Sequence, residues 1–264
     1  MKTDNWLFKY KQGWVDYFQE IEQHYQNDTN VQRICGHGCI LEEYPIIEYK
    51  KIIPELYIYN PETLQKIKDM KEALNLHDDT YDSIFIRRGD KMYRESYYFE
   101  TSKYIELLLL KNPHCKKIFL QTDDYNCFID LKKYISDHDL HIDVMTLCDP
   151  RHKGMVIFNS LKNTVSSNSD GKNYEYLKTI VTDLHESKSV DSMNRDEIYN
   201  HTMTMIIGLD IVFNSNICVT EYQSNVSRFI KLAHKNFDNV YNIMDPNNDI
   251  DINKKICLAH SGSM

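Results

Sequence analysis

Glycine, proline and arginine are all scarce in this 264-residue sequence, which holds 8 glycines, 6 prolines and seven arginines. Flexible linkers and low-complexity tracts are rich in glycine, proline or serine, so this composition excludes a linker-rich chain. No internal repeat is found. Hydrophobic residues make up 42% of the sequence and charged residues 27%, which is the balance of a folded globular protein.

Positive charge is also in short supply. The sequence has 31 lysines and arginines against 39 aspartates and glutamates, a formal net charge of -8. That balance disfavours broad contact with a nucleic-acid backbone or an anionic membrane, although it is compatible with one small basic pocket. We therefore expect no nucleic-acid partner.

Long apolar runs are missing. The longest, at 107–110 and 205–213, fall far short of the roughly 20 residues that a membrane-spanning helix needs. The first residues lack the apolar core of a secretory signal. We therefore expect a cytoplasmic protein without a membrane span, either microbial or made in a virus-infected cell.

The seven cysteines are an odd number and are scattered through apolar segments. This favours reduced interior thiols over a disulfide framework. The segment 35–39 places two cysteines and a histidine close together, but no second pair of ligands lies nearby. We expect a turn there, and no metal site.

Strand and helix patterns alternate from residue 83 onward. Apolar runs predict strands at 83–88, 116–122, 141–146, 217–220 and 237–243. Caps and helical periodicity predict helices at 61–74, 101–111, 125–136 and 174–185, one ending near Asp210, one capped by Ser224, and a loop at 166–172. This alternation predicts an α/β fold with a mostly parallel sheet, whose ligands bind beyond the carboxyl ends of the strands.

Two short segments gather arginine and hydroxyl groups at predicted strand ends. Arg87 and Arg88 end the first strand, where a guanidinium offers paired donors to a phosphate. The alternative is a structural pair between Arg88 and Asp90. The second segment, 224–228, begins a helix directly after a strand, where backbone N–H groups and Arg228 favour an anion. Its alternative is a well-capped helix with a surface arginine.

Taken together, these segments resemble the motifs of the fucosyltransferase superfamily, which includes the α1,6-fucosyltransferases, the NodZ-like enzymes and the protein O-fucosyltransferases. The family motif His-x-Arg-Arg-x-Asp corresponds to 85–90, and its Thr-Asp-Asp strand end corresponds to 122–124. Its last motif, with Asp-Ile, Val-x-Thr and Ser-Ser-x-x-x-Arg, corresponds to 210–228. Phe85 replaces the family histidine, and Gln223 replaces the first serine of the pair.

The resemblance implies a GT-B glycosyltransferase fold. Residues 82–240 would form a Rossmann-like nucleotide-sugar lobe, 1–81 a reduced N-terminal lobe on the acceptor side, and 241–264 a tail that crosses back. The implied activity is inverting, metal-independent transfer of L-fucose from GDP-fucose to a glycan hydroxyl, with no cofactor. A transferase for another nucleotide sugar, and a non-catalytic nucleotide- or glycan-binding module of the same fold, remain as alternatives.

The resemblance also implies roles for single residues. Glu95 would be the general base, Lys91 would hold or tune it, and Arg87 would stabilise the diphosphate leaving group. The residues implied in donor binding are Arg87, Arg88, Asp124, Asp210, Ser224, Asn225 and Arg228. By spacing alone, Lys91 and Glu95 could equally form a solvated ion pair. Asp210, implied to accept from guanine N–H groups, could equally cap a helix.

Overall fold

A computed structural model describes residues 16–19, 50–51, 53–54, 57–88, 98–152, 193–222 and 224–245. The chain divides into two compact units, Met1–Met70 with Asp249–Met264, and Lys71–Asn248. The predicted helix at 174–185 and the predicted loop at 166–172 lie outside the described residues. The lobe boundaries drawn from the family resemblance stay predictions.

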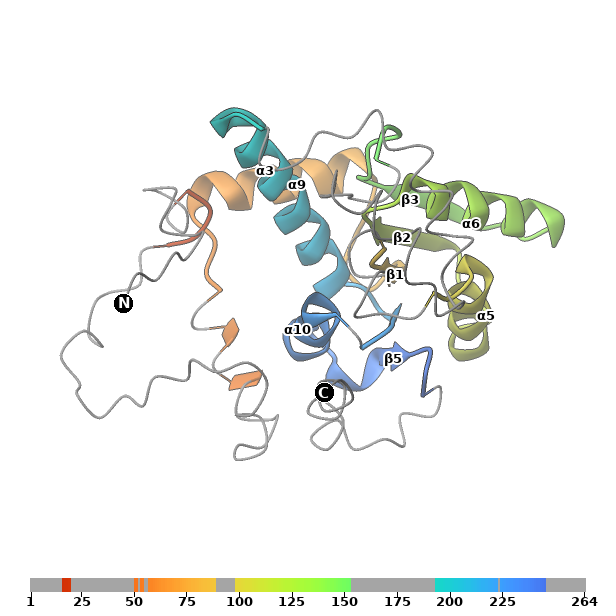
Figure 1. Ribbon diagram of the computed structural model, residues 1–264. Coiled ribbons are helices and arrows are strands. Elements are labelled where there is room, and N and C mark those ends of the chain that lie inside the picture. The colour runs from red at the N-terminus through yellow and green to blue at the C-terminus, as the bar shows by residue number, and fades with distance from the viewer. Residues whose placement is uncertain are drawn as a thin grey trace, which may run out of the picture. The chain divides into compact units, whose positions relative to one another are not determined.

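Five parallel strands form the sheet of the larger unit (Figure 1). In chain order they are β1 (Asp82–Ile86), β2 (Lys117–Thr122), β3 (Asp143–Thr146), β4 (Cys218–Thr220) and β5 (Val240–Asn242). Their order across the sheet is β3-β2-β1-β4-β5, and every neighbouring pair is parallel. The predicted α/β class and parallel sheet are confirmed, and this strand order is consistent with a Rossmann-like fold.

Helices stand where their caps and apolar periodicity predict them. They are α3 (Pro61–Ala73), α5 (Thr101–Lys111), α6 (Tyr125–Asp137), α9 (Arg195–Phe213) and α10 (Asn225–Ala233), with the short 3₁₀ helix η3 (Phe237–Asn239). Asn60 caps α3, since its Oδ1 accepts the N–H of Thr63 at 2.8 Å. The last predicted strand is shorter than expected because η3 takes up its first three residues. No helix in these ranges is long and apolar enough to cross a membrane.

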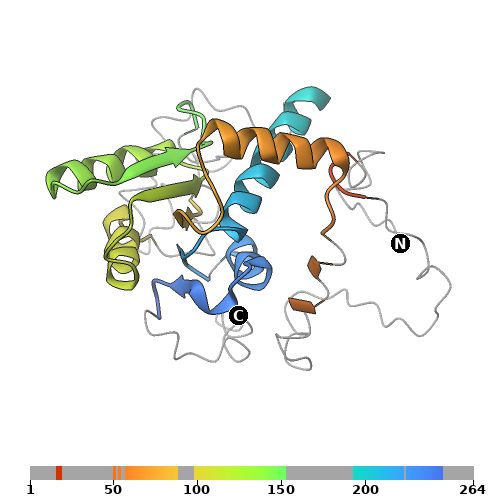
Figure 2. The same cartoon turned by 180° about the vertical axis from the view of Figure 1, so that it is seen from behind.

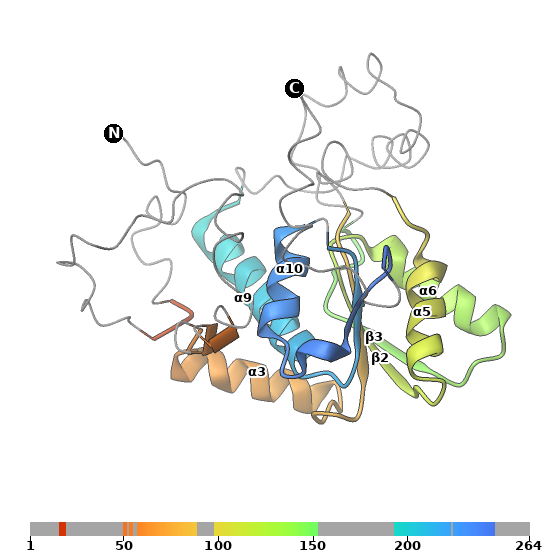
Figure 3. The same ribbon diagram turned by 90° about the horizontal axis from the view of Figure 1, so that it is seen from below.

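Helices cover both faces of the sheet. Helices α5 and α6 pack against each other and against β1 to β4, while α9 packs on β1 and β2 and contacts α10. Figure 3 shows the two pairs on opposite sides of the strands, and Figure 2 gives the view from behind. The chain thus builds outward from β1 to β3, then crosses the other face in α9 to reach β4. The point where this direction reverses lies between β1 and β4.

The core is built from the two faces of these strands. Ile84, Ile86, Ile118 and Leu120 are buried in a cluster that also holds residues of α5 and α6. Side chains alternate along a strand, so Phe85 and Phe119, which are also buried, point to the opposite face. A sheet covered on both faces needs continuous apolar strands, which explains the short uninterrupted runs in the sequence.

Candidate functional site

The carboxyl ends of three strands bring polar side chains to one edge of the sheet. Arg87 and Arg88 follow β1, Asp123 and Asp124 follow β2, and Glu221 follows β4. Because β1 and β4 are neighbours, Arg87 stands at the point where the winding reverses, which is the usual ligand position in such sheets. We take this edge as the candidate site.

Asp123 holds Arg87 in place. Nη1 of Arg87 lies 2.5 Å from Oδ2 of Asp123, and the backbone N–H of Arg88 donates to Oδ1 of Asp123 at 2.7 Å. Burial raises the pKa of Asp123 to about 6, against the opposing charge of Arg87 and the N–H of Arg88. Asp123 is therefore ionised at neutral pH. Sequence reasoning noted Asp123 at the strand end but gave it no role.

Asp124 has a different structural role from Asp123. Its side chain is completely buried and accepts the N–H of Asn126 at 3.0 Å, so it caps α6. Its own N–H donates to Oγ1 of Thr122 at 3.1 Å. Among the described contacts, the carboxylate paired with Arg87 is that of Asp123, whereas the family motif led us to expect Asp124 to bind the donor.

Arg88 is buried in a second set of contacts. It is only 2% exposed, and its Nη2 donates to the carbonyl of Phe99 at 2.8 Å and to Oγ1 of Thr101 at 3.3 Å. Its guanidinium also lies 4.4 Å from the ring centroid of Tyr98, a cation–π contact. Arg88 therefore ties the end of β1 to the start of α5. The alternative partner Asp90 lies outside the described residues.

A buried acid ends β4. Glu221 is 1% exposed, and its carboxyl oxygens lie 3.2 Å from Oγ of Ser227 and 3.4 Å from the hydroxyl of Tyr104. Burial raises the pKa of Glu221 to about 8, helped by the charge of Asp123. Glu221 is thus largely neutral at pH 7 and acts as a hydrogen-bonding group. It was not singled out from the sequence, where only its place after a predicted strand marked it.

The start of α10 closes the site on the β4 side. Ser224 is buried and caps this helix, since its Oγ accepts the N–H of Ser227 at 3.0 Å, as the sequence predicted. Asn225 is exposed. Arg228 donates from Nε to the carbonyl of Tyr222 at 2.9 Å and has Nη1 3.5 Å from Oδ1 of Asn225, so it braces the turn before the helix.

Asp210 lies at the other end of the sheet. It is near the end of α9, where the hydroxyl of Tyr81 donates to the carbonyl of Ile211 at 2.7 Å. Tyr81 precedes β1, whereas Arg87 follows it, and five strand residues at about 3.3 Å each separate them. Asp210 pairs instead with Lys71, Nζ to Oδ2 at 3.5 Å. The structure does not bring Asp210 together with the other predicted donor-binding residues.

Two histidines that the sequence analysis did not single out lie at the candidate site. His152 and His201 have ring centroids 5.8 Å apart in an edge-to-face arrangement, and the charge of Arg87 acts on His201. They come from the segment after β3 and from α9, and no spacing in the sequence links them.

The predicted base Glu95, its partner Lys91 and the replaced serine position Gln223 lie outside the described residues. Among the residues that are described, no three histidine, cysteine, aspartate or glutamate side chains are placed to share a metal ion. The expectations of no metal and no cofactor stay predictions.

The similarity to known proteins remains at the level of short motifs. No protein-family model matches the chain, and no curated protein is significantly similar to it in sequence. The resemblance to fucosyltransferases therefore depends on three motifs and their order along the chain.

Proposed function

We propose that this chain is an inverting glycosyltransferase that transfers a sugar, L-fucose from GDP-fucose, to a glycan hydroxyl. The observation that carries the proposal is the position of Arg87, oriented by Asp123 at the reversal point between β1 and β4. Sheets of this topology bind nucleotides at that point. The order of the three family-like motifs is the reason for proposing fucose as the transferred sugar.

The reaction requires two contributions from the protein, stabilisation of the leaving group and removal of the acceptor proton. The acceptor oxygen attacks the anomeric carbon of fucose as the bond to the diphosphate breaks, and the bonding electrons leave on the diphosphate. Arg87 and the N-terminal N–H groups of α10 would stabilise that developing charge. Glu95 would take the acceptor proton, with Lys91 tuning it. A single displacement of this kind inverts the anomeric configuration.

Calorimetric titration of the metal-free protein with GDP, and with UDP as comparison, tests the proposal. We expect GDP to bind and Arg87→Ala to weaken binding at least about tenfold, because hydrogen bonds to charged groups contribute about 1.5–3 kcal/mol each. Arg195→Ala, which removes an exposed arginine at the start of α9, is the matched control and should bind as the wild type does.

A transfer assay on the same preparations separates binding from chemistry. Glu95→Gln should keep GDP affinity and lose transfer by about 10²-fold or more. Unchanged transfer by Glu95→Gln would show that another residue is the base. Absence of GDP and UDP binding would contradict the proposal and favour a non-catalytic glycan-binding module.

A glycosyltransferase that uses another nucleotide sugar is the second candidate, and two observations favour it. Phe85 stands where the family carries a histidine, and it is buried in β1. Asp210, the expected guanine acceptor, lies at the amino end of the sheet. Tighter binding of UDP than of GDP would support this candidate.

A further inference from the structure

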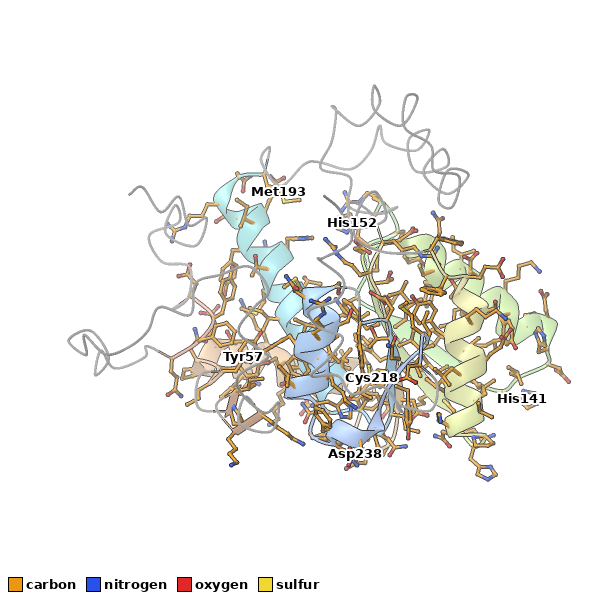
Figure 4. All side chains as sticks on the ribbon, turned by 60° about the horizontal axis from the view of Figure 1, so that its bottom comes forward. Tyr57, His141, His152, Met193, Cys218 and Asp238 are labelled. Carbon is orange, nitrogen blue, oxygen red and sulfur yellow. The ribbon has the colours of Figure 1, made fainter. Side chains whose placement is uncertain are left out.

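Two histidines at the carboxyl edge of the sheet have no part in the proposed reaction. The rings of His152 and His201 lie edge to face with centroids 5.8 Å apart, and both residues are half-buried. In Figure 4 His152 lies toward one end of the strands, away from His141 and Asp238, which precede β3 and β5. The pair therefore shares the edge that carries Arg87.

The backbone on each side of the pair is held firmly. The carbonyl of His152 accepts the first N–H of α6, from Tyr125, at 2.7 Å, and its own N–H donates to the carbonyl of Asp149 at 2.8 Å. Asp149 in turn accepts the backbone N–H and the Nε of Arg151, at 2.8 and 2.9 Å. His201 stands on the long helix α9. The backbone that carries each imidazole is thus fixed in advance of any ligand.

The positive charge of Arg87 acts on one member of the pair. Burial, the neighbouring His152 and the charge of Arg87 all lower the pKa of His201. Each protonated imidazole would therefore repel the other and Arg87. An anion placed among these three groups relieves that repulsion and accepts hydrogen bonds from all of them.

The acidic groups on the surrounding elements already have partners. They are Asp123 and Asp124 after β2, Asp149 after β3, and Glu197 one turn before His201 on α9. Asp123 pairs with Arg87, and Asp149 pairs with Arg151. Asp124 caps α6, and Glu197 belongs to the capping box of α9. The charge of Asp149 acts on His152, but its hydrogen bonds go to Arg151, so among the described contacts no carboxylate is hydrogen-bonded to either imidazole.

We propose that His152 and His201, together with Arg87, bind a tetrahedral dianion, and that the imidazole pair takes up a proton from solvent as the anion binds. The inference rests on the proposed function only in taking that anion to be a phosphate of the nucleotide sugar. Proton uptake on binding makes affinity rise as pH falls. The histidine pair thereby adds a pH-dependent contact to the site at Arg87, beside Asp123, whose own pKa of about 6 also lies in this range.

Sulfate and GDP-fucose are the probes, because neither the sulfate dianion nor a diphosphate esterified at both ends changes its charge between pH 5.5 and 8. Each is titrated into the full chain at constant ionic strength, in two buffers of different ionisation enthalpy. We expect sulfate to bind severalfold more tightly at pH 5.5 than at pH 8, because raising one histidine pKa by one unit changes the affinity by at most about tenfold. The heats in the two buffers should differ by the enthalpy of a captured proton.

Variants locate the effect. His201→Asn and His152→Asn should each flatten the pH dependence of sulfate affinity, while His141→Asn, an exposed histidine before β3, should leave it unchanged. Proton NMR of the wild type provides a readout independent of the variants: the imidazole signal missing from His201→Asn should titrate at higher pH when sulfate is present. A wild-type affinity independent of pH, or an NMR titration that sulfate does not move, would overturn the inference.

The two probes separate this inference from the proposed function. Sulfate binding with the expected pH dependence, but no binding of GDP-fucose, would support the anion site and contradict the proposal that GDP-fucose is the donor. GDP-fucose binding at a pH-independent affinity would support the donor and contradict the role of the histidines.

Discussion

Glu221 and Asp123 are two acids at one edge of the sheet with different protonation states at neutral pH. Asp123 has Arg87 beside it and is ionised, whereas the side-chain partners described for Glu221 are hydroxyls, and burial raises its pKa to about 8. A buried acid without a cationic partner is stable only in its neutral form. The environment, and not the residue type, therefore decides which of the two carries charge.

Replacing Glu221 should change how stability depends on pH. Its pKa is higher in the folded protein than the ordinary value of 4.5, so its contribution to stability is complete below about pH 4.5 and is lost as pH rises toward 8. Between pH 5 and 8 we expect the wild type to lose about 3 kcal/mol more of its unfolding free energy than Glu221→Gln, which stays neutral.

Urea unfolding at pH 5, 6.5 and 8 measures this difference. Glu106→Gln, which neutralises an exposed carboxylate on the nearby helix α5, should show the wild-type pH dependence. Parallel curves for the wild type and Glu221→Gln would mean that Glu221 is ionised in the folded protein.

At the same scale, the sequence located the candidate site better than it assigned partners within it. Parallel strands align their carboxyl ends, so Arg87 and the start of α10 could be expected at one edge before any contact was known. Which of Asp123 and Asp124 pairs with Arg87 could not be predicted from the sequence, because adjacent residues at a strand end point in different directions. One of them meets Arg87, and the other caps α6.

At the scale of the elements, α9 lies close to the sheet at Gly208. A Cβ added to Gly208 would lie 2.0 Å from Oε1 and 2.6 Å from Cδ of Gln121 on β2. The absence of a side chain at Gly208 thus lets Gln121 lie against the helix. Glycine in a helix interior costs about 1 kcal/mol relative to alanine, and this contact explains why the position tolerates it.

The pair Gly208 and Gln121 should therefore be energetically coupled. Gly208→Ala gains helix propensity but must displace the Gln121 side chain, and we expect a net loss of about 1 kcal/mol. In Gly208→Ala/Gln121→Ala the obstacle is gone, so stability should exceed that of Gln121→Ala alone by about 1 kcal/mol. A double-mutant cycle by urea unfolding gives the coupling, and additive effects would contradict this contact.

Element positions were predictable where local signals are strong. Asn60 and Ser224 mark helix starts with side chains that cap in the structure as the sequence predicts. The end of α9 at Phe213 and the replacement of strand by η3 carry no comparable signal. Both depend on packing against other elements, which overrides local preference.

At the scale of the whole molecule, the order β3-β2-β1-β4-β5 decides which predicted residues share a site. The alternating pattern predicts parallel strands but not the path of α9, which runs back across the sheet and carries Asp210 to the amino end. The same path brings His201 beside His152. A reversal of chain direction over this distance has no local sequence signature, so both outcomes required the structure.

Hydrogen exchange should show that a bound nucleotide acts at one edge only. With GDP at 100 times its dissociation constant, the unfolding free energy should rise by about 2.7 kcal/mol. We expect amide exchange to slow more at Arg88, Tyr125 and Ser227 than at Asn216 and Lys235, which lie at the amino end of the sheet with Tyr81 and Phe213.

Stronger protection around Asn216 than around Arg88 would move the nucleotide to the end that holds Asp210. The measurement needs no substitution, so it tests the position of the site in the unaltered protein. Exchange with UDP in place of GDP provides the comparison for base preference.

The buried guanidinium of Arg88 has a consequence for how such a protein could diversify. It joins the residue before segment 89–97 to Tyr98, Phe99 and Thr101 after it, so the two anchor points of that segment are fixed whatever lies between them. Doubling the length of a segment between fixed ends costs only about 0.6 kcal/mol of closure entropy. A change in the length of the segment between Arg88 and Tyr98 should therefore cost little stability, because the two residues that flank it stay joined while the sheet keeps its packing.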